Sequence, residues 1–134
     1  MPLTLFASPE LNVSLDPVGV EERVASIAFD VVADLSMPFQ QTHLTIKECW
    51  FAHEALNAFE AQLNALQHQD EGEATLLNMS ERPIIRVVRK GATLTSIIRS
   101  TDTMGLGAST IEVSGYATEI SEILARYRSC EKWW

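Results

Sequence analysis

The residues best suited to catalysis are a cysteine and a histidine that lie close together in the sequence. Cys49 and His53 are four residues apart, and a thiol nucleophile needs a base of this kind within hydrogen-bond reach. A predicted junction between a strand and a helix falls between them, so the two side chains need not face the same way. No third orienting group and no oxyanion motif accompanies the pair. A core thiol and a surface histidine explain both residues, and we expect no catalytic residue and no enzymatic activity.

Motifs that bind metals or nucleotides are absent from the sequence. It contains no HExxH, no HxxxH and no paired CxxC, so no metal site is indicated. It contains no GxxxxGK[ST] and no GxSxG, and Gly105-Leu106-Gly107 lacks the third glycine of a dinucleotide-binding loop. Cys49 and Cys130 are too few for a disulfide scaffold; free thiols are expected, and a disulfide between them stays open. We therefore expect no metal and no cofactor.

Charged residues offer two further hypotheses. Glu48 could form a carboxylate dyad with Asp30 or Asp34, although solvation or ion pairs are simpler explanations. A basic cluster on a predicted hairpin could bind phosphate, but it has no interleaved aromatic residues. Cross-strand pairing, or protection of sheet edges, explains it better. The basic cluster consists of Arg82, Arg86, Arg89, Lys90 and Arg99.

The net charge of −8 is concentrated in the first half of the chain. Residues 1–66 carry nine acids and two bases, whereas residues 67–134 carry nine acids and eight bases. An acidic protein repels phosphate, which argues against a nucleic-acid partner. It attracts a basic protein instead. Acidity that serves only solubility is the simpler alternative.

Hydrophobic periodicity predicts eight strands and two helices. Ala25, Ile27, Phe29, Val31, Ala33 and Leu35 recur with period two, as in a half-buried antiparallel strand. Leu56, Phe59, Leu63 and Leu66 recur at helical spacing. The predicted strands are 3–7, 11–15, 23–35, 39–50, 73–79, 83–89, 92–99 and 109–115; the predicted helices are 52–67 and a second one that Thr118 caps and that carries Ile120, Ile123, Leu124 and Tyr127 on one face.

Three local features refine this prediction. Asp16-Pro17 is expected to end the second strand in a loop. In the fourth strand Trp50 is expected to share a face with Leu44 and Ile46. Residues 45–59 and 110–124 align without a gap and share Thr, Ile, Ala and Glu. We therefore predict a single α+β domain over residues 1–134, with a mostly antiparallel sheet and a ββββα pseudo-repeat; one or two sheet layers remain open.

A family resemblance suggests a function. A helix with Leu56, Phe59, Leu63 and Leu66 is followed by Gly72-Glu73-Ala74, which opens a strand, and by a hairpin that ends at Lys90-Gly91. From about residue 24 this layout resembles the WapI-type bacterial immunity proteins and their relatives. The loop at 100–108 is longer than that family leads one to expect. The resemblance implies a cytoplasmic antitoxin that binds a cognate toxin domain, and it supplies no catalytic residues.

The expected partner is therefore a toxin protein, basic in charge, with no nucleic acid and no membrane involved. A structural or assembly subunit, such as a homodimer, is the main alternative, and a small enzyme is the third. Trp133-Trp134 could anchor a partner or pack back onto the sheet. The predicted contact residues for the toxin are Glu21, Glu22, Asp30, Asp34, Asp70, Glu71 and Glu73.

Overall fold

The chain forms four strands and a helix, and then repeats that order. The computed structural model describes residues 2–102 and 104–129. The first half contains β1 (Leu3–Ala7), β2 (Leu11–Glu21), β3 (Ser26–Met37), β4 (Gln40–Ala52) and α1 (His53–Leu66). The second half contains β5 (Glu71–Leu77), β6 (Pro83–Lys90), β7 (Thr93–Thr101), β8 (Ala108–Tyr116), a 3-10 helix η1 (Ala117–Glu119) and α2 (Ile120–Ser129). The α+β class and the repeated ββββα layout are confirmed.

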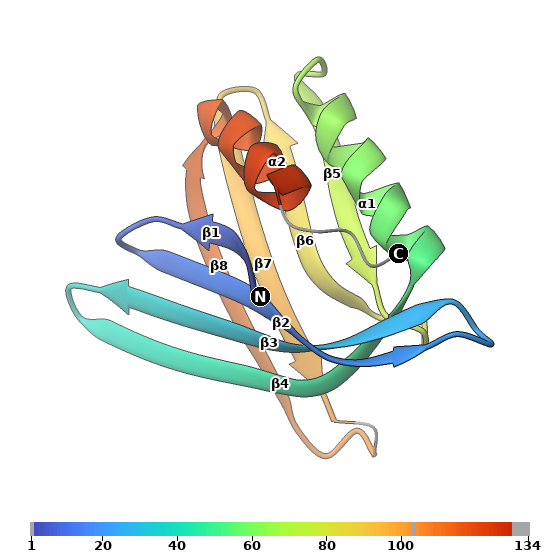
Figure 1. Cartoon of the computed structure of the whole chain (residues 1–134). Coiled ribbons are helices and arrows are strands. Elements are labelled where there is room, and N and C mark those ends of the chain that lie inside the picture. Colours follow the sequence, from blue (N-terminus) through green and yellow to red (C-terminus); the bar gives the residue numbers. More distant parts are fainter. Residues whose placement is uncertain (1, 103, 130–134) are drawn as a thin grey trace.

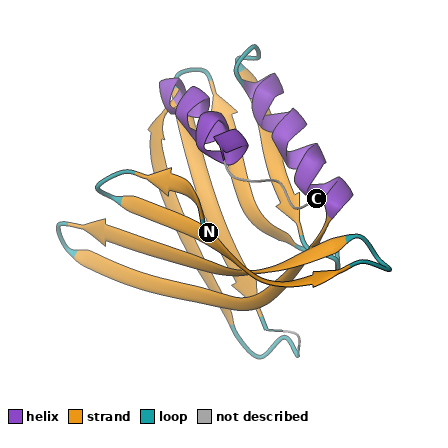
Figure 2. Cartoon of the chain, in the orientation of Figure 1, coloured by secondary structure: helices purple, strands orange, loops and turns teal. Residues whose placement is uncertain are grey.

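The strands form two antiparallel sheets of four. Sheet A has the order β1-β2-β3-β4 and sheet B the order β5-β6-β7-β8. The strands of sheet A cross those of sheet B, and both helices lie on the same side of sheet A (Figure 1). Helix α1 packs along β5, and α2 packs against β1 and α1. Neither of the two described α-helices lies on the opposite side of sheet A (Figure 2).

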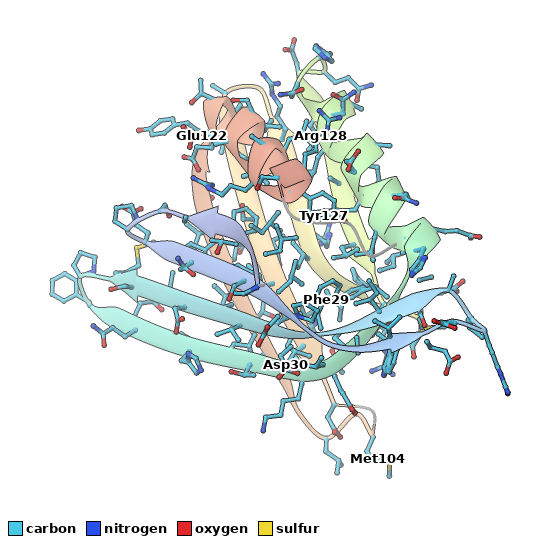
Figure 3. All side chains as sticks on the ribbon, viewed as in Figure 1. Phe29, Asp30, Met104, Glu122, Tyr127 and Arg128 are labelled. Carbon is cyan, nitrogen blue, oxygen red and sulfur yellow. The ribbon has the colours of Figure 1, made fainter. Side chains whose placement is uncertain are left out.

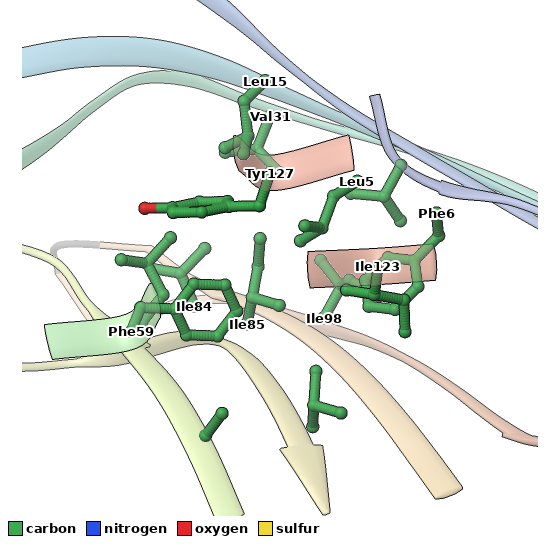
Figure 4. Packing of buried hydrophobic residues seen from close by; sticks show 14 of the residues in the cluster. Leu5, Phe6, Leu15, Val31, Phe59, Ile84, Ile85, Ile98, Ile123 and Tyr127 are labelled. Carbon is green, nitrogen blue, oxygen red and sulfur yellow. The ribbon is translucent and has the colours of Figure 1, made fainter. Parts of the chain in front are cut away.

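One hydrophobic core lies between the sheets and under the helices. Residues of β3 alternate as predicted, with Ile27, Phe29, Val31, Ala33 and Leu35 buried, and the four apolar residues of α1 are buried as well. Tyr127 of α2 lies inside this core (Figure 4). Its hydroxyl donates to the Leu56 carbonyl at 2.8 Å, and its ring meets Phe59 edge-on with centroids 5.5 Å apart.

Strand β2 is longer than predicted and continues through Asp16-Pro17. The ladder that joins β2 to β1 ends at the pair Leu3–Leu15. Beyond Leu15 one side of β2 therefore has no ladder to complete, and the missing N–H of Pro17 costs nothing there. A bulge between Pro17 and Gly19 then carries β2 on to Glu21.

The predicted facing of β4 is wrong at its C-terminal end. Asp30 of β3 faces two residues of β4, because Phe29 pairs with Cys49 whereas Val31 pairs with Ile46. The extra residue is a β-bulge, in which Glu48 adopts a positive φ of 51°. The bulge turns Cys49 and Phe51 into the core. Trp50 lies on the other face, where its ring covers Gly19.

Two smaller expectations at element ends are also wrong. Ala25 is exposed in the turn before β3 instead of buried within a strand. Thr118 does not cap α2, because it lies inside η1. The backbone amide of Tyr116 instead donates to the Glu119 carboxylate at 3.1 Å. In the described ranges, no helix combines the length and apolar character needed to cross a membrane.

Candidate functional site

The outer side of sheet A gathers three aspartates on one uncovered surface. Asp16 of β2 pairs directly with Asp30 of β3, and Asp34 lies four residues further along β3. Because side chains alternate along a strand, Asp30 and Asp34 face the side opposite the buried Phe29 and Val31. These two neighbours on β3, the buried Phe29 and the outward Asp30, can be located in Figure 3. We call Asp16, Asp30 and Asp34 the acidic face.

The three aspartates differ in what holds them. Asp34 accepts from His43 Nδ1 at 2.5 Å, and both side chains are more than half exposed. Asp30 accepts the backbone amide of Glu48 at 2.9 Å and so supports the bulge of β4. Asp16 is exposed and forms no ion pair with another described residue. Within the described part of the chain, the acidic face therefore contains one carboxylate without an ion-pair partner, directly opposite a second one.

Trp50 adds an aromatic surface beside the acidic face. It pairs with Ala28 of β3, and its ring lies 3.4 Å from the position that a Cβ on Gly19 would occupy. Ala28 is fully buried, although it belongs to the outer side, and Trp50 is half-buried. The outer side of sheet A thus combines carboxylates with a partly accessible indole.

The structure separates the seven predicted contact residues. Asp30 and Asp34 lie on the acidic face, and Glu21 and Glu22 lie at the β2–β3 turn of the same sheet. Glu71 and Glu73 lie at the start of β5, in sheet B, and Asp70 directly precedes that strand. Glu73 is engaged by Arg86, whose Nε donates to it at 2.5 Å. This hydrogen bond holds the pKa of Glu73 below its ordinary value of 4.5.

Sequence reasoning missed Asp16 and Trp50. Asp16 precedes a proline that predicted a loop, and Trp50 changes face because of a bulge. A signal for Asp16 exists in its spacing, since it continues the outward series of Asn12 and Ser14 in the second strand. No residue type at the bulge gives a comparable signal.

The basic cluster serves the fold of sheet B and does not form one site. Arg86 pairs with Glu73, and Arg99 donates to Thr110 at 2.9 Å across β7 and β8. Arg89 donates to the Leu66 carbonyl at 2.7 Å, at the C-terminal end of α1. Arg86 and Arg89 lie on β6, inside the sheet, so they do not protect an edge. The expected cross-strand role fits these contacts.

The Cys49–His53 pair has no feature of an activated nucleophile. Burial raises the pKa of the Cys49 thiol to about 11, so the reactive thiolate is suppressed at neutral pH. His53 Nε2 is buried and makes no hydrogen bond to any residue that the structure describes. The carboxylate dyad of Glu48 with Asp30, which the sequence offered as the less favoured hypothesis, is not the contact that forms: the Glu48 backbone amide donates to the Asp30 carboxylate.

Metal ligands do not converge in the described ranges. No group of three or more His, Cys, Asp or Glu side chains is placed to hold an ion there. Cys130 and Trp133-Trp134 lie outside the described residues. Comparisons with protein-family models, curated proteins and solved structures find no match for this chain. The arrangement of the acidic face is therefore the basis for a functional proposal.

Proposed function

We propose that this chain is an immunity-type inhibitor, which binds a basic toxin domain through the acidic face and blocks it. The observation that carries the proposal is the pairing of Asp16 with Asp30. Like charges directly opposite one another destabilise a sheet. A local cost to stability is expected where a surface serves binding. Lysine or arginine side chains of a partner would relieve the repulsion.

The distribution of charge supports a directed encounter with such a partner. Residues 1–52, which form sheet A, carry seven acids and two bases. Residues 71–116, which form sheet B, carry five acids and five bases. The negative field is therefore strongest over sheet A, and a basic protein is steered toward that sheet.

Trp50, beside the acidic face, would contribute binding energy in addition to the steering that the carboxylates provide. Rim charges mainly increase the association rate, whereas buried aromatic residues dominate the energy of many interfaces. Trp50 lies one cross-strand row from Asp30 on the same side. The resemblance to WapI-type immunity proteins, which rests on the helix with Leu56, Phe59, Leu63 and Leu66 and on the strands that follow it, favours the same proposal.

The proposal is tested by co-purification with the product of the adjacent gene, at low and at high salt. We expect a 1:1 complex that weakens as salt rises, because salt screens exposed charges. The same experiment with Glu54→Gln/Glu81→Gln controls for net charge, since both residues are exposed and lie outside sheet A. Absence of any complex at either salt concentration would refute the proposal.

A structural subunit is the second candidate, favoured by the open edge of sheet B. Strand β8 has nine residues and ends its sheet without a further strand partner among the described residues. Open edges can pair between copies. Light scattering at micromolar concentration distinguishes the two: a monomer favours the inhibitor, and a stable dimer favours the subunit.

A further inference from the structure

Strand β8 presents an open row of backbone hydrogen-bonding groups. The amide of Ala117 donates to the Ala92 carbonyl at 2.8 Å, so at this end of β8 the odd-numbered amides point toward β7. Backbone direction alternates along a strand, and the register with β7 is regular from Tyr116 to Ala108. The amides and carbonyls of Thr110, Glu112 and Ser114 therefore point away from the sheet.

Among the described residues, the other sheet edges are covered or interrupted, whereas nothing covers or interrupts β8. Helix α2 packs against β1, and α1 packs along β5. Strand β4 has the bulge at Glu48, and its Trp50 carbonyl already accepts the Met79 amide at 2.9 Å. Strand β8 reads ASTIEVSGY, with no lysine and no proline, and Glu112 is its single charged residue, so it has little of the protection that is usual at an edge.

A groove of about 260 Å³ runs beside the end of this edge. The β8 residues Val113–Tyr116 form one wall, and the β1–β2 turn and α2 form the others. Phe6, Leu11 and Ile123 give it an apolar floor. Ser96 also lines the groove; it is 6% exposed, and its hydroxyl forms no hydrogen bond to the residues described in the structure. The groove therefore offers an unpartnered polar group beneath an open strand edge.

Carboxylates predominate among the charged groups of this groove. Glu10, Glu119 and Glu122 line it, against the single base Arg126. Glu119 is used by the Tyr116 amide at 3.1 Å, and Arg126 lies 3.6 Å from Glu122. The Glu10 side chain has no ion pair within the described ranges. Two of the groove's walls thus present negative charge.

We propose that β8 and this groove bind an extended protein segment that adds a strand to sheet B and carries a lysine or arginine toward Glu10 and Glu122. Backbone pairing along Thr110, Glu112 and Ser114 provides affinity, and the groove selects side chains. A second copy of the chain is a poorer occupant, because it would bring two acidic grooves and two Glu112 side chains together. The proposal goes beyond the proposed function, since it uses a surface different from the acidic face.

The test is selection of ten-residue peptides from a random display library on the full chain, followed by fluorescence polarisation with the enriched peptide. We expect enrichment of β-forming sequences with lysine or arginine. Ser114→Pro removes an outward amide and leaves the β7 ladder intact, whereas Ser114→Ala keeps that amide. We expect a loss of at least tenfold in affinity for the proline variant and less than twofold for the alanine variant.

Amide hydrogen exchange keeps the test decisive even if Ser114→Pro fails to fold. In the unaltered chain, the peptide should slow exchange at Thr110, Glu112 and Ser114. Glu10→Gln/Glu122→Gln should weaken binding by about threefold for each charge removed. Enrichment of no sequence, dimerisation through β8, or protection confined to other strands would overturn the proposal.

One further double variant separates this proposal from the proposed function. Asp16→Asn/Asp34→Asn should leave peptide binding at β8 unchanged, because both side chains lie on the outer side of sheet A and neither lines the groove. If the peptide binds and the adjacent gene product does not, the proposed function fails alone. If the gene product binds and no peptide is enriched, the strand-addition site fails alone.

Discussion

Asp16 and Asp30 lie directly opposite one another on neighbouring strands of sheet A. Cross-strand repulsion of this kind costs about 0.2–1 kcal/mol. Asp16→Asn should therefore raise the free energy of unfolding by an amount in that range, measured by urea denaturation. The same variant should weaken partner binding. A variant that lowers stability would contradict the repulsion. Glu81→Gln serves as the control, because Glu81 lies between β5 and β6 and has no cross-strand partner.

Asp30 has a second role, because it supports the bulge that brings Cys49 and Phe51 into the core. Its carboxylate accepts the Glu48 amide at 2.9 Å. Asp30→Ala and Asp30→Asn both remove the charge, but only alanine removes the acceptor. Denaturation should show the alanine variant to be less stable than the asparagine variant by about 1 kcal/mol. Equal stabilities would show that the bulge does not depend on this contact.

Tyr127 ties the two helices together through its hydroxyl and its ring. Tyr127→Phe removes the hydrogen bond to the Leu56 carbonyl and should cost about 1 kcal/mol. Tyr127→Ala also empties the space beside Phe59 and should cost about 3–5 kcal/mol. Thermal and urea denaturation measure both changes. Similar stability for the two variants would mean that ring packing contributes little.

Cys49 should be inert in the folded protein. Because burial raises the pKa of its thiol from 9.0 to about 11, the thiolate fraction at pH 8 falls by about 100-fold relative to an unfolded chain. We expect slow reaction with a disulfide reagent in the folded state and fast reaction in urea, measured on a Cys130→Ser background. Reaction of the folded protein at the rate of a free thiol would contradict the burial and would revive a catalytic role.

The Arg86–Glu73 contact should make stability depend on pH. Since folding lowers the pKa of Glu73 below 4.5, its contribution is present above pH 4.5 and is lost as the pH falls through the folded pKa. The Glu73 side chain is 37% exposed, so the contribution is about 0.2–1 kcal/mol. The stability difference between the unaltered chain and Glu73→Gln should shrink toward zero below pH 4.5. A difference that is constant with pH would refute this.

The sequence was sufficient to predict the elements, because their periods are strong and local. The alternation from Ile27 to Leu35 and the helical spacing from Leu56 to Leu66 both survive in the fold. The prediction that was wrong is the side of the sheet on which a side chain lies, and it was wrong where the backbone is irregular. The bulge at Glu48 places a glutamate at positive φ, and nothing in that residue type signals such a conformation. Trp50 was therefore assigned to the wrong face.

The acidic face could be predicted only in part. Asp30 and Asp34 follow from the alternation of a single strand. Their relation to Asp16 depends on the register of β2 against β3, which the sequence does not specify. Proline usually ends a central strand, and only the short length of β1 makes Pro17 acceptable. The separation of Glu73 from this surface likewise required the assignment of β5 to a second sheet.

The most direct test of the proposed function is calorimetric titration with the adjacent gene product, at about 50 mM and 500 mM salt. The account predicts 1:1 binding that weakens with salt and that Asp16→Asn/Asp34→Asn reduces by about tenfold or more. Glu54→Gln/Glu81→Gln removes the same charge elsewhere and should change the affinity by less than about threefold. Equal losses for the two double variants, or affinity that is independent of salt, would contradict binding through the acidic face.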